Sequence, residues 1–438
     1  MDEMTMRRAI EQKRAGAPLT DEQWVDVVTG FMQHEIDDAQ MAALLMACVW
    51  RGMSVDETYA LTDAMVRSGE RLQFDRGDIV DKHSTGGVSD IVSLVAVPLA
   101  AACGAHVAKL SGRALGHTGG TIDKLEMIPG FNVNLSPQAF IAQVERIGCA
   151  IAAQTDALAP ADKHLYKLRD HTGTVPSMGL IAASIASKKV AGGANAFVFD
   201  VKSGRAAFMQ DPHDAEKLAA LLVELSARFN RRATAFVTDM NEPLGRAIGP
   251  YPELLEARNF LKQPHPMLRQ AQHDKSPTQH DKSPTCHPEL VEGRVLTVVL
   301  AMVEAMLEAV GVSDGKERAR EALASGAAYD KFLEMIEAQG GTRATFETMQ
   351  LCDARETVRA GKSGFIESID VVRLGNVARE LSGRDPHGGI VVAAAIGERI
   401  QANTPLAHIY GSDASPAAML AGAFTIGNDA PGATPLIR

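Results

Sequence analysis

The strongest constraint on the fold is a repeated order of short apolar strand, loop and helix that begins near residue 78. Short apolar segments recur in that order at residues 78–80, 105–110, 151–153, 196–201 and 234–237. Such alternation is typical of a mainly parallel sheet with helices on its faces. Ligands of a parallel sheet bind where strands end and helices begin. We therefore expect an α/β domain with its binding site at the carboxyl ends of these strands.

The two ends of the chain show other patterns. Residues 1–70 contain capping boxes at 20–23 and 54–57 and predict three short amphipathic helices. Residues 158–192 predict two more helices that join them, and short strands broken by Gly and Pro follow residue 342. The expected fold class is α/β, with a small all-α domain (1–70, joined by 160–192), a large α/β domain with a mainly parallel central sheet (71–159 and 193–330), and a C-terminal α+β domain (340–438).

One polar stretch interrupts this order. The heptapeptide QHDKSPT at residues 272–278 is repeated without change at residues 279–285. Residues 262–293 are polar and rich in proline, so we expect a flexible surface insertion there. Cys286 and His287 could be offered as metal ligands. Because tandem duplication alone raises the local number of histidines, we expect no metal site.

Composition narrows the classes of function. The chain has 438 residues, and its 44 Lys and Arg against 54 Asp and Glu give a net charge of −10. An acidic balance argues against nucleic acid as a partner. Five scattered cysteines argue against a disulfide scaffold, and no segment resembles a secretory signal or a membrane span. We expect a cytoplasmic protein with no nucleic-acid or membrane partner.

Two loops carry the chemistry of an anion site. Residues 81–90, DKHSTGGVSD, and residues 111–126, SGRALGHTGGTIDKLE, each follow a strand and begin a helix. Free main-chain amides at helix N-termini bind anions, and glycine lets the chain approach them closely. Because the loops follow successive strands, they can converge on one phosphate. The alternative is two unrelated turns, with Asp123 and Glu126 as ordinary acids of a first helical turn.

A third group of polar residues is predicted on helices. Asp162, Tyr166 and Arg169 are spaced by four and three residues. Ser184 and Lys188 are spaced by four, so each set lies on one helix face. They can be solvated charge pairs. Alternatively, Arg169 and Lys188 donate hydrogen bonds to the carbonyl oxygens of a flat polar ligand, and Ser184 completes that edge.

These segments resemble the characteristic motifs of the thymidine/pyrimidine-nucleoside phosphorylase family. The resemblance runs from near the N-terminus to the end, apart from the insertion. It is strongest at residues 111–126, 81–88 (DKHSTGGV), 158–170 (LAPADKHLYKLRD), 184–189 (SIASKK) and 200–209 (DVKSGRAAFM). It implies a pentosyltransferase in which phosphate attacks C1′ of thymidine and releases thymine and 2-deoxyribose 1-phosphate, in nucleoside salvage or catabolism. No cofactor is implied, because inorganic phosphate is a substrate.

The resemblance also implies a role for individual residues. The implied phosphate ligands are Lys82, Ser84, Ser93, Ser111 and Thr121. The implied base contacts are Leu115, Tyr166, Arg169, Ser184, Lys188 and Phe208. Of these, Arg169 and Lys188 are implied to be catalytic together with His83, which would give a proton or a hydrogen bond to a base carbonyl. Asp162 would orient a nearby cation.

Similar enzymes are homodimers in which a helical domain closes onto an α/β domain, which predicts hinges near residues 71–77 and 192–193. This chain departs from the family at Ser89, where a turn needing positive φ usually has Gly, and at Arg205 and Ala206, which replace small residues. We expect an active enzyme whose activity these three residues reduce. Three alternatives stay open: a broad uridine/thymidine phosphorylase, an anthranilate-type phosphoribosyltransferase, and a non-catalytic nucleoside- or phosphate-binding protein.

Overall fold

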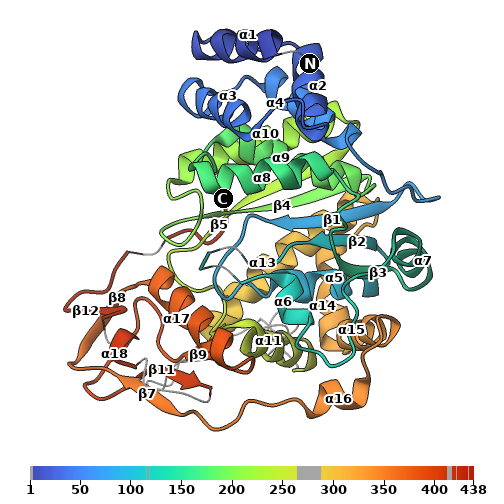
Figure 1. Ribbon diagram of the computed structural model, residues 1–438. Coiled ribbons are helices and arrows are strands. Elements are labelled where there is room, and N and C mark those ends of the chain that lie inside the picture. Colours follow the sequence, from blue (N-terminus) through green and yellow to red (C-terminus); the bar gives the residue numbers. More distant parts are fainter. Residues whose placement is uncertain are drawn as a thin grey trace.

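The computed structural model describes residues 3–114, 116–117, 119–263, 288–411, 417–420, 422–432 and 434–438. It contains a helical part, an α/β part with a parallel sheet, and a C-terminal part with antiparallel sheets, which confirms the expected fold class (Figure 1). Leu115, the duplicated heptapeptide and the pair Cys286–His287 lie outside the described residues. Within these ranges, no helix has the length and apolar character needed to cross a membrane.

Residues 3–69, all of which the structure describes, form four helices: α1 (Glu3–Arg14), α2 (Asp21–Met32), α3 (Asp38–Arg51) and α4 (Val55–Arg67). The expected capping boxes are present at Thr20 and Ser54, and Asp37 forms another. The sequence predicted only three helices here. The fourth, α1, was missed because half of its residues are charged, although Met6 and Ala9 bury one face.

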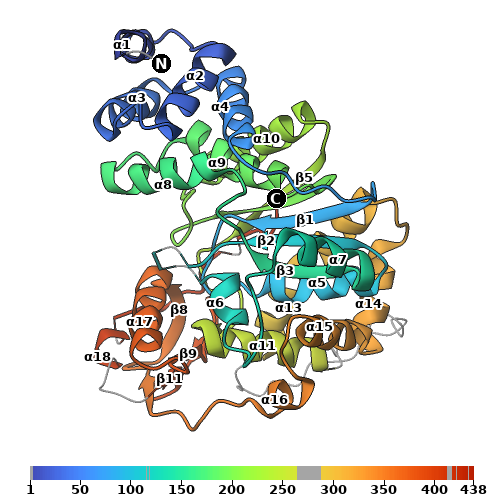
Figure 2. The same cartoon turned by 45° about the vertical axis from the view of Figure 1, so that its right-hand side comes forward.

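Two later helices, α8 (Pro160–Thr172) and α9 (Met178–Ala191), pack on these helices. Leu165 of α8 and Leu180 of α9 share an apolar core with Trp24. On its other face, α9 places Ala182 and Ile185 in the core that covers the central sheet. Helix α9 therefore lies between the helical part and the sheet, as Figure 2 shows.

The described residues contain one five-stranded parallel sheet, in the order β3-β2-β1-β4-β5. Its strands are β1 (Ile79–Ser84), β2 (His106–Ser111), β3 (Cys149–Ala153), β4 (Ala196–Ser203) and β5 (Arg232–Asp239). Each overlaps one of the apolar segments that the sequence singled out. Since all five run parallel, their carboxyl ends meet at one edge of the sheet.

Alternating residues of each strand face opposite layers. In β4, Ala196 and Val198 pack with α5 (Val92–Ala102) and α13 (Pro288–Ala309), whereas Phe197 and Phe199 pack with α9 and α10 (Pro212–Arg228). The layer around α5 also contains, nearby, α6 (Thr121–Leu125), α7 (Pro137–Ile147), α11 (Pro250–Lys262), α14 (Gly315–Ala324), α15 (Ala327–Ala338) and α16 (Arg343–Thr348). Helices α11 and α13 reach into the two ends of the range 262–293 for which the sequence predicts an insertion, as far as Lys262 and from Pro288 on.

The C-terminal part contains two antiparallel sheets, with strand orders β10-β8-β12 and β6-β9-β11-β7. Its elements are β7 (Glu356–Arg359), β8 (Gly364–Ile369), α17 (Val371–Arg384), β9 (Gly389–Val392), β10 (Arg399–Ile400), β11 (Pro405–Tyr410), α18 (Ala417–Leu420) and β12 (Phe424–Gly427). Strand β6 (Ala247–Ile248) comes from the α/β part, so the second sheet joins the two parts.

The segments that link the helical part to the sheet are hydrogen-bonded to one another. The Glu70 amide donates to the Ala157 carbonyl at 2.8 Å, and the Leu72 amide donates to the Ala191 carbonyl at 2.8 Å. Gly193 has a φ of +82°, and a Cβ there would lie 2.3 Å from the Leu72 carbonyl oxygen. These contacts lie at or beside the two segments where the sequence predicts hinges.

Gly193→Ala should destabilise the protein more than Gly104→Ala. Both glycines have positive φ, but a Cβ at Gly104 meets nothing within 4 Å. Gly104→Ala should cost about 1–2 kcal/mol of unfolding free energy from backbone strain alone. Gly193→Ala should cost more, because the Leu72 carbonyl must also move. Equal losses in urea unfolding would contradict the close crossing.

Candidate active site

A cavity of about 340 Å³ opens at the carboxyl ends of the central strands. Its lining includes His83 and Ser84 at the end of β1 and Ser111 at the end of β2. Across from them, Ser184 and Lys188 of α9 line it too. This is the edge at which a parallel sheet binds its ligands.

The hydroxyl side chains that the resemblance assigned to phosphate line this cavity together. We call them the hydroxyl cluster: Ser84, Ser93, Ser111 and Thr121. Ser93 lies in the first turn of α5, and Thr121 is the first residue of α6. Both glycine-rich loops therefore reach one cavity, as the sequence predicted, and are not unrelated turns.

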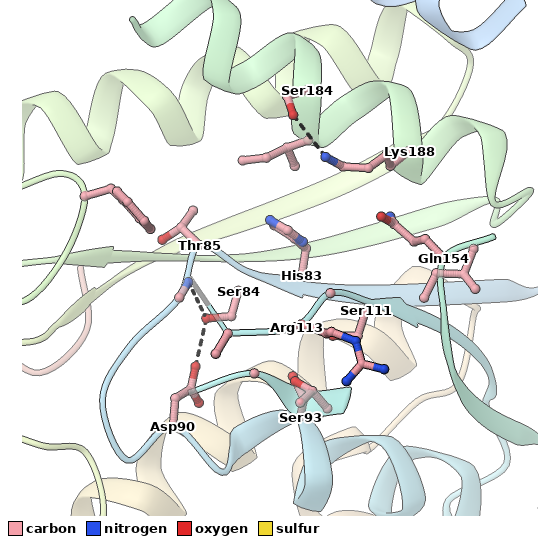
Figure 3. Close-up of a pocket in the computed structure, with 18 of the residues that line it drawn as sticks. His83, Ser84, Thr85, Asp90, Ser93, Ser111, Arg113, Gln154, Ser184 and Lys188 are labelled. Carbon is pink, nitrogen blue, oxygen red and sulfur yellow. Dashed lines mark hydrogen bonds between the residues drawn. The ribbon is translucent and has the colours of Figure 1, made fainter. Parts of the chain in front are cut away.

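The alternation of β1 sends neighbouring residues to opposite sides of the cavity. Figure 3 shows His83 pointing toward the helix that carries Ser184 and Lys188. Ser84 points the other way, toward Asp90, and its Oγ donates to the Asp90 Oδ2 at 2.8 Å (Figure 3). One strand thus supplies a side chain to each side of the cavity.

Ion pairs and a contact with the loop that follows β4 hold the second glycine-rich loop. Arg113 donates to Asp123 Oδ1 at 3.1 Å and to Glu126 Oε1 at 2.7 Å. His117 Nε2 lies 2.9 Å from the Ala206 carbonyl oxygen. Asp123 and Glu126 therefore fold the loop back onto α6 instead of serving only as first-turn acids.

Buried charged side chains lie beneath the hydroxyl cluster. Lys202 Nζ lies 2.9 Å from Asp200 Oδ2 and 3.7 Å from Asp90 Oδ2, and Lys82 Nζ donates to Asp200 at 3.0 Å. Burial alone would raise the pKa of Asp90, but Lys202 and Lys82 hold that pKa below its usual range. Asp90 is therefore ionised and can fix the Ser84 hydroxyl. Lys82 is fully buried and does not line the cavity.

One cation of the cavity, Lys109 of β2, was not foreseen from the sequence. Its side chain is buried and lines the cavity. Of the residues that the structure describes, only the Leu110 carbonyl accepts a hydrogen bond from its Nζ, at 3.3 Å. Burial and then Lys189 lower the pKa of Lys109 well below its usual value. An anion bound beside this side chain would favour its charged form, so the position suits an anionic ligand. In the sequence, the position of Lys109 just before the loop that begins at residue 111 could have indicated this role.

A second set of polar residues, the helical group, lines the cavity from α8 and α9: Tyr166, Ser184 and Lys188. Lys188 Nζ donates to the Ser184 Oγ at 3.0 Å and to Asp162 Oδ2 at 2.6 Å. It also lies 5.9 Å from the centre of the Tyr166 ring. Asp162 thus holds Lys188 in place from outside the lining. Apolar side chains complete this side, namely Val175, Ile181, Ile185, Phe208, Met209 and Leu218.

Arg169, which was expected to contact a ligand, does not line the cavity. It is buried, and its guanidinium donates to the carbonyl oxygens of Thr174 at 3.3 Å, Val175 at 2.9 Å and Leu180 at 3.0 Å. A planar guanidinium with several fixed donors suits such a role. Arg169 therefore shapes the turn between α8 and α9, from which Val175 reaches the cavity.

The imidazole of His83 is held neutral. Burial, followed by the positive charges of Lys189 and Lys109, lowers the pKa of His83 well below its usual value. A neutral imidazole has one N–H donor and one acceptor. His83 can therefore give a hydrogen bond to a ligand at neutral pH, whereas giving a proton would need the charged form that this site disfavours.

Comparison with known proteins places this geometry in a family. The family described as "Glycosyl transferase family, helical bundle domain" matches residues 7–69, and "Glycosyl transferase family, a/b domain" matches residues 76–329. Thymidine phosphorylase of Mycobacterium tuberculosis is 41% identical over 98% of this chain and 96% of its own. Pyrimidine-nucleoside phosphorylase of Geobacillus stearothermophilus is 39% identical over 93% of this chain and 92% of its own.

The chain belongs to the family of thymidine and pyrimidine-nucleoside phosphorylases. The resemblance read from its motifs is thereby confirmed. The crystal structure of anthranilate phosphoribosyltransferase from Thermus thermophilus aligns with a TM-score of 0.57 at 22% identity, covering 76% of this chain and 99% of that one. This likeness shows a shared fold.

The departures from the pattern of this phosphorylase family do not fill the cavity. Arg205 is exposed and outside the lining, and Ala206 is buried with a φ in the ordinary range. Ser89 is buried with a φ of +58°, the left-handed conformation that the sequence suggested. Its Oγ lies 3.5 Å from Glu256 Oε2, and burial raises the pKa of Glu256 to about 7.

Ser89→Gly should stabilise the protein. Removing Cβ relieves about 1–2 kcal/mol of left-handed strain, and the greater freedom of glycine in the unfolded chain offsets about half of it, for a net gain of about 0.5–1 kcal/mol. Ser89→Ala keeps the strain and loses the hydroxyl, so it should not stabilise. Urea unfolding of the three proteins tests this, and an equal change in both variants would show that strain is not the cause.

Proposed function

We propose that this protein catalyses the phosphorolysis of thymidine to thymine and 2-deoxyribose 1-phosphate. The observation that carries the proposal is one cavity with a side suited to an anion and an opposite side suited to a flat base. The first side has the hydroxyl cluster and Lys109, and the second has the helical group. The names of the relatives, thymidine phosphorylase and pyrimidine-nucleoside phosphorylase, support the same reaction.

Phosphate binds at the hydroxyl cluster in this proposal. The hydroxyls of Ser93, Ser111 and Thr121 donate to its oxygens, and Lys109 supplies the positive charge. Ser84 gives its hydroxyl hydrogen to Asp90 and accepts the Gly86 amide at 3.3 Å, so it orders the loop, and it donates to phosphate only if its hydroxyl turns away from Asp90. Lys82 acts from below through Asp200 and does not touch the ligand.

In the reaction, an oxygen of phosphate attacks C1′ on the face of the sugar opposite the base. The C1′–N1 bond breaks, and its electron pair leaves with the pyrimidine, whose carbonyl oxygens become more negative. The departing anion becomes thymine by taking up the proton that hydrogen phosphate loses when its oxygen bonds C1′. The ammonium of Lys188 and the neutral N–H of His83 donate hydrogen bonds to those oxygens and stabilise the charge as it forms. Ser184 holds Lys188 and gives the base edge a further polar contact.

Arg169 and Tyr166 support this arrangement in different ways. Tyr166 lines the cavity, and its ring lies beside Lys188. Arg169 positions the turn after α8 through its three carbonyl contacts. A direct contact between Arg169 and the base would require that turn to release its carbonyl groups. Phe208, which is 44% exposed, would pack against the base when the cavity is filled.

We further propose that the protein acts as a homodimer in the cytoplasm. Helix α3 exposes Trp50 over 80% of its surface, and Met46, four residues earlier on the same face, is also exposed. The two side chains form an apolar patch on one face of α3, which supports a surface that a second copy of the chain covers.

Release of thymine from thymidine should depend on phosphate. The test is a product assay with thymidine, deoxyuridine and uridine, each with and without phosphate, and we expect turnover of thymidine only when phosphate is present. Release from uridine at a similar rate would make the enzyme a broad pyrimidine-nucleoside phosphorylase. Binding of thymidine and phosphate without any product would contradict catalysis and favour a binding protein.

Lys188→Ala and Ser111→Ala should affect different substrates. Loss of Lys188 removes a charged donor that stabilises the departing base and should lower kcat/KM for thymidine about 10–100-fold, with KM for phosphate nearly unchanged. Loss of Ser111 should raise KM for phosphate about 5–10-fold and leave thymidine nearly unaffected. Steady-state kinetics with each substrate varied in turn, on variants shown by circular dichroism to be folded, measure this. Equal effects on both substrates would contradict the two-sided cavity.

A further inference from the structure

Gln154 is a polar residue of the cavity that neither the motifs nor the proposed reaction uses. It follows β3 directly, and the register of the sheet pairs Ala153 with Ser111, so Gln154 lies next to the hydroxyl cluster. Its side chain lines the cavity and is partly buried. Its amide makes no hydrogen bond to any residue in the part of the chain that the structure describes.

The Gln154 amide lies between the two sides of the cavity. In Figure 3 the Gln154 amide extends toward His83, at a level below Ser184 and Lys188 and above Ser111. Under the proposed function, the base occupies the upper side and phosphate the lower one. The carbon that phosphate attacks, C1′, belongs to the pentose and carries the base. The pentose therefore lies between the two sides, at the level of Gln154.

Stereochemistry then decides which part of the pentose Gln154 meets. In thymidine the base and the 5′-hydroxymethyl group lie on one face of the ring, and the 3′-hydroxyl lies on the other. Phosphate attacks from the face opposite the base, so the 3′-hydroxyl is on the same side as the hydroxyl cluster. A carboxamide next to that cluster is within the same region, and it offers both a donor and an acceptor to a hydroxyl.

We propose that Gln154 binds the 3′-hydroxyl of the pentose and makes the enzyme specific for nucleosides that carry it. This inference rests on the proposed function. An amide that has no partner within the described part of the protein but bonds the substrate is left unpaired when that hydroxyl is missing. Sites built this way reject analogues that lack the hydroxyl more strongly than apolar pockets reject a missing methylene.

The test is a thermodynamic cycle that combines one change in the enzyme with one change in the substrate. We would measure kcat/KM for thymidine and for 3′-deoxythymidine, which lacks only that hydroxyl, with the wild-type protein and with Gln154→Ala. Wild type should prefer thymidine by about 10–100-fold. In the variant this preference should fall to within about threefold, because the hydroxyl has lost its partner. An unchanged preference would overturn the inference.

Controls separate this role from a general disturbance of the cavity. Gln154→Leu keeps the size of the side chain and removes only its polar atoms, so it should lose the preference as well. Ser184→Ala alters the helical group and should leave the preference for the 3′-hydroxyl intact. The preference for thymidine over 5′-deoxythymidine should be the same in wild type and both Gln154 variants. Failure of wild type to release thymine at all would instead refute the proposed function, and this inference with it.

Discussion

The arrangement of the cavity depends on the buried pairing of lysines with aspartates beneath it. Lys82 donates a hydrogen bond to Asp200, and Lys202 forms an ion pair with it. Lys202 also lies close to Asp90, which holds the Ser84 hydroxyl. Buried charges are costly unless paired, and breaking a buried pair costs about 3–5 kcal/mol. The end of β1 is therefore fixed in one geometry, and every residue that β1 presents to the cavity takes its place from that geometry.

Helix α9 has the corresponding role on the other side. One of its faces packs with the N-terminal helices and another with the sheet. Two of its polar residues, Ser184 and Lys188, lie between these faces and line the cavity. Because Lys188 has its carboxylate partner, Asp162, on the neighbouring α8, its ammonium is held in one position before any ligand is present. Two separate polar networks therefore face each other across one space.

Much of this could be predicted from the sequence, because the signals are local. Short apolar segments alternating with helical ones predicted the strands, and parallel strands bring their carboxyl ends together, so the two glycine-rich loops were expected to meet. The capping boxes at Thr20 and Ser54 depend only on residues three apart. The side chains of Ser184 and Lys188 lie together because they are spaced by one helical turn.

The rest depended on packing that no local pattern carries. Arg169 donates to three carbonyl groups only because the turn after α8 folds over it. The sequence therefore could not show that Arg169 lies outside the cavity lining. Lys109 and Gln154 reach the cavity because β2 lies between β1 and β3, which is a property of strand order. The α1 helix was missed because two buried residues in a charged segment are a weak signal.

The division of the contacts between sheet and helices has a consequence for the order of events under the proposed function. The anion contacts belong to the sheet and the loops that follow it, whereas the ammonium and the hydroxyl for the base belong to α9. Phosphate thus has all its contacts on the sheet side, whereas the base also needs His83 of β1 in addition to α9. Phosphate can load without the helical part, and the arrival of the base links the helical part to the sheet.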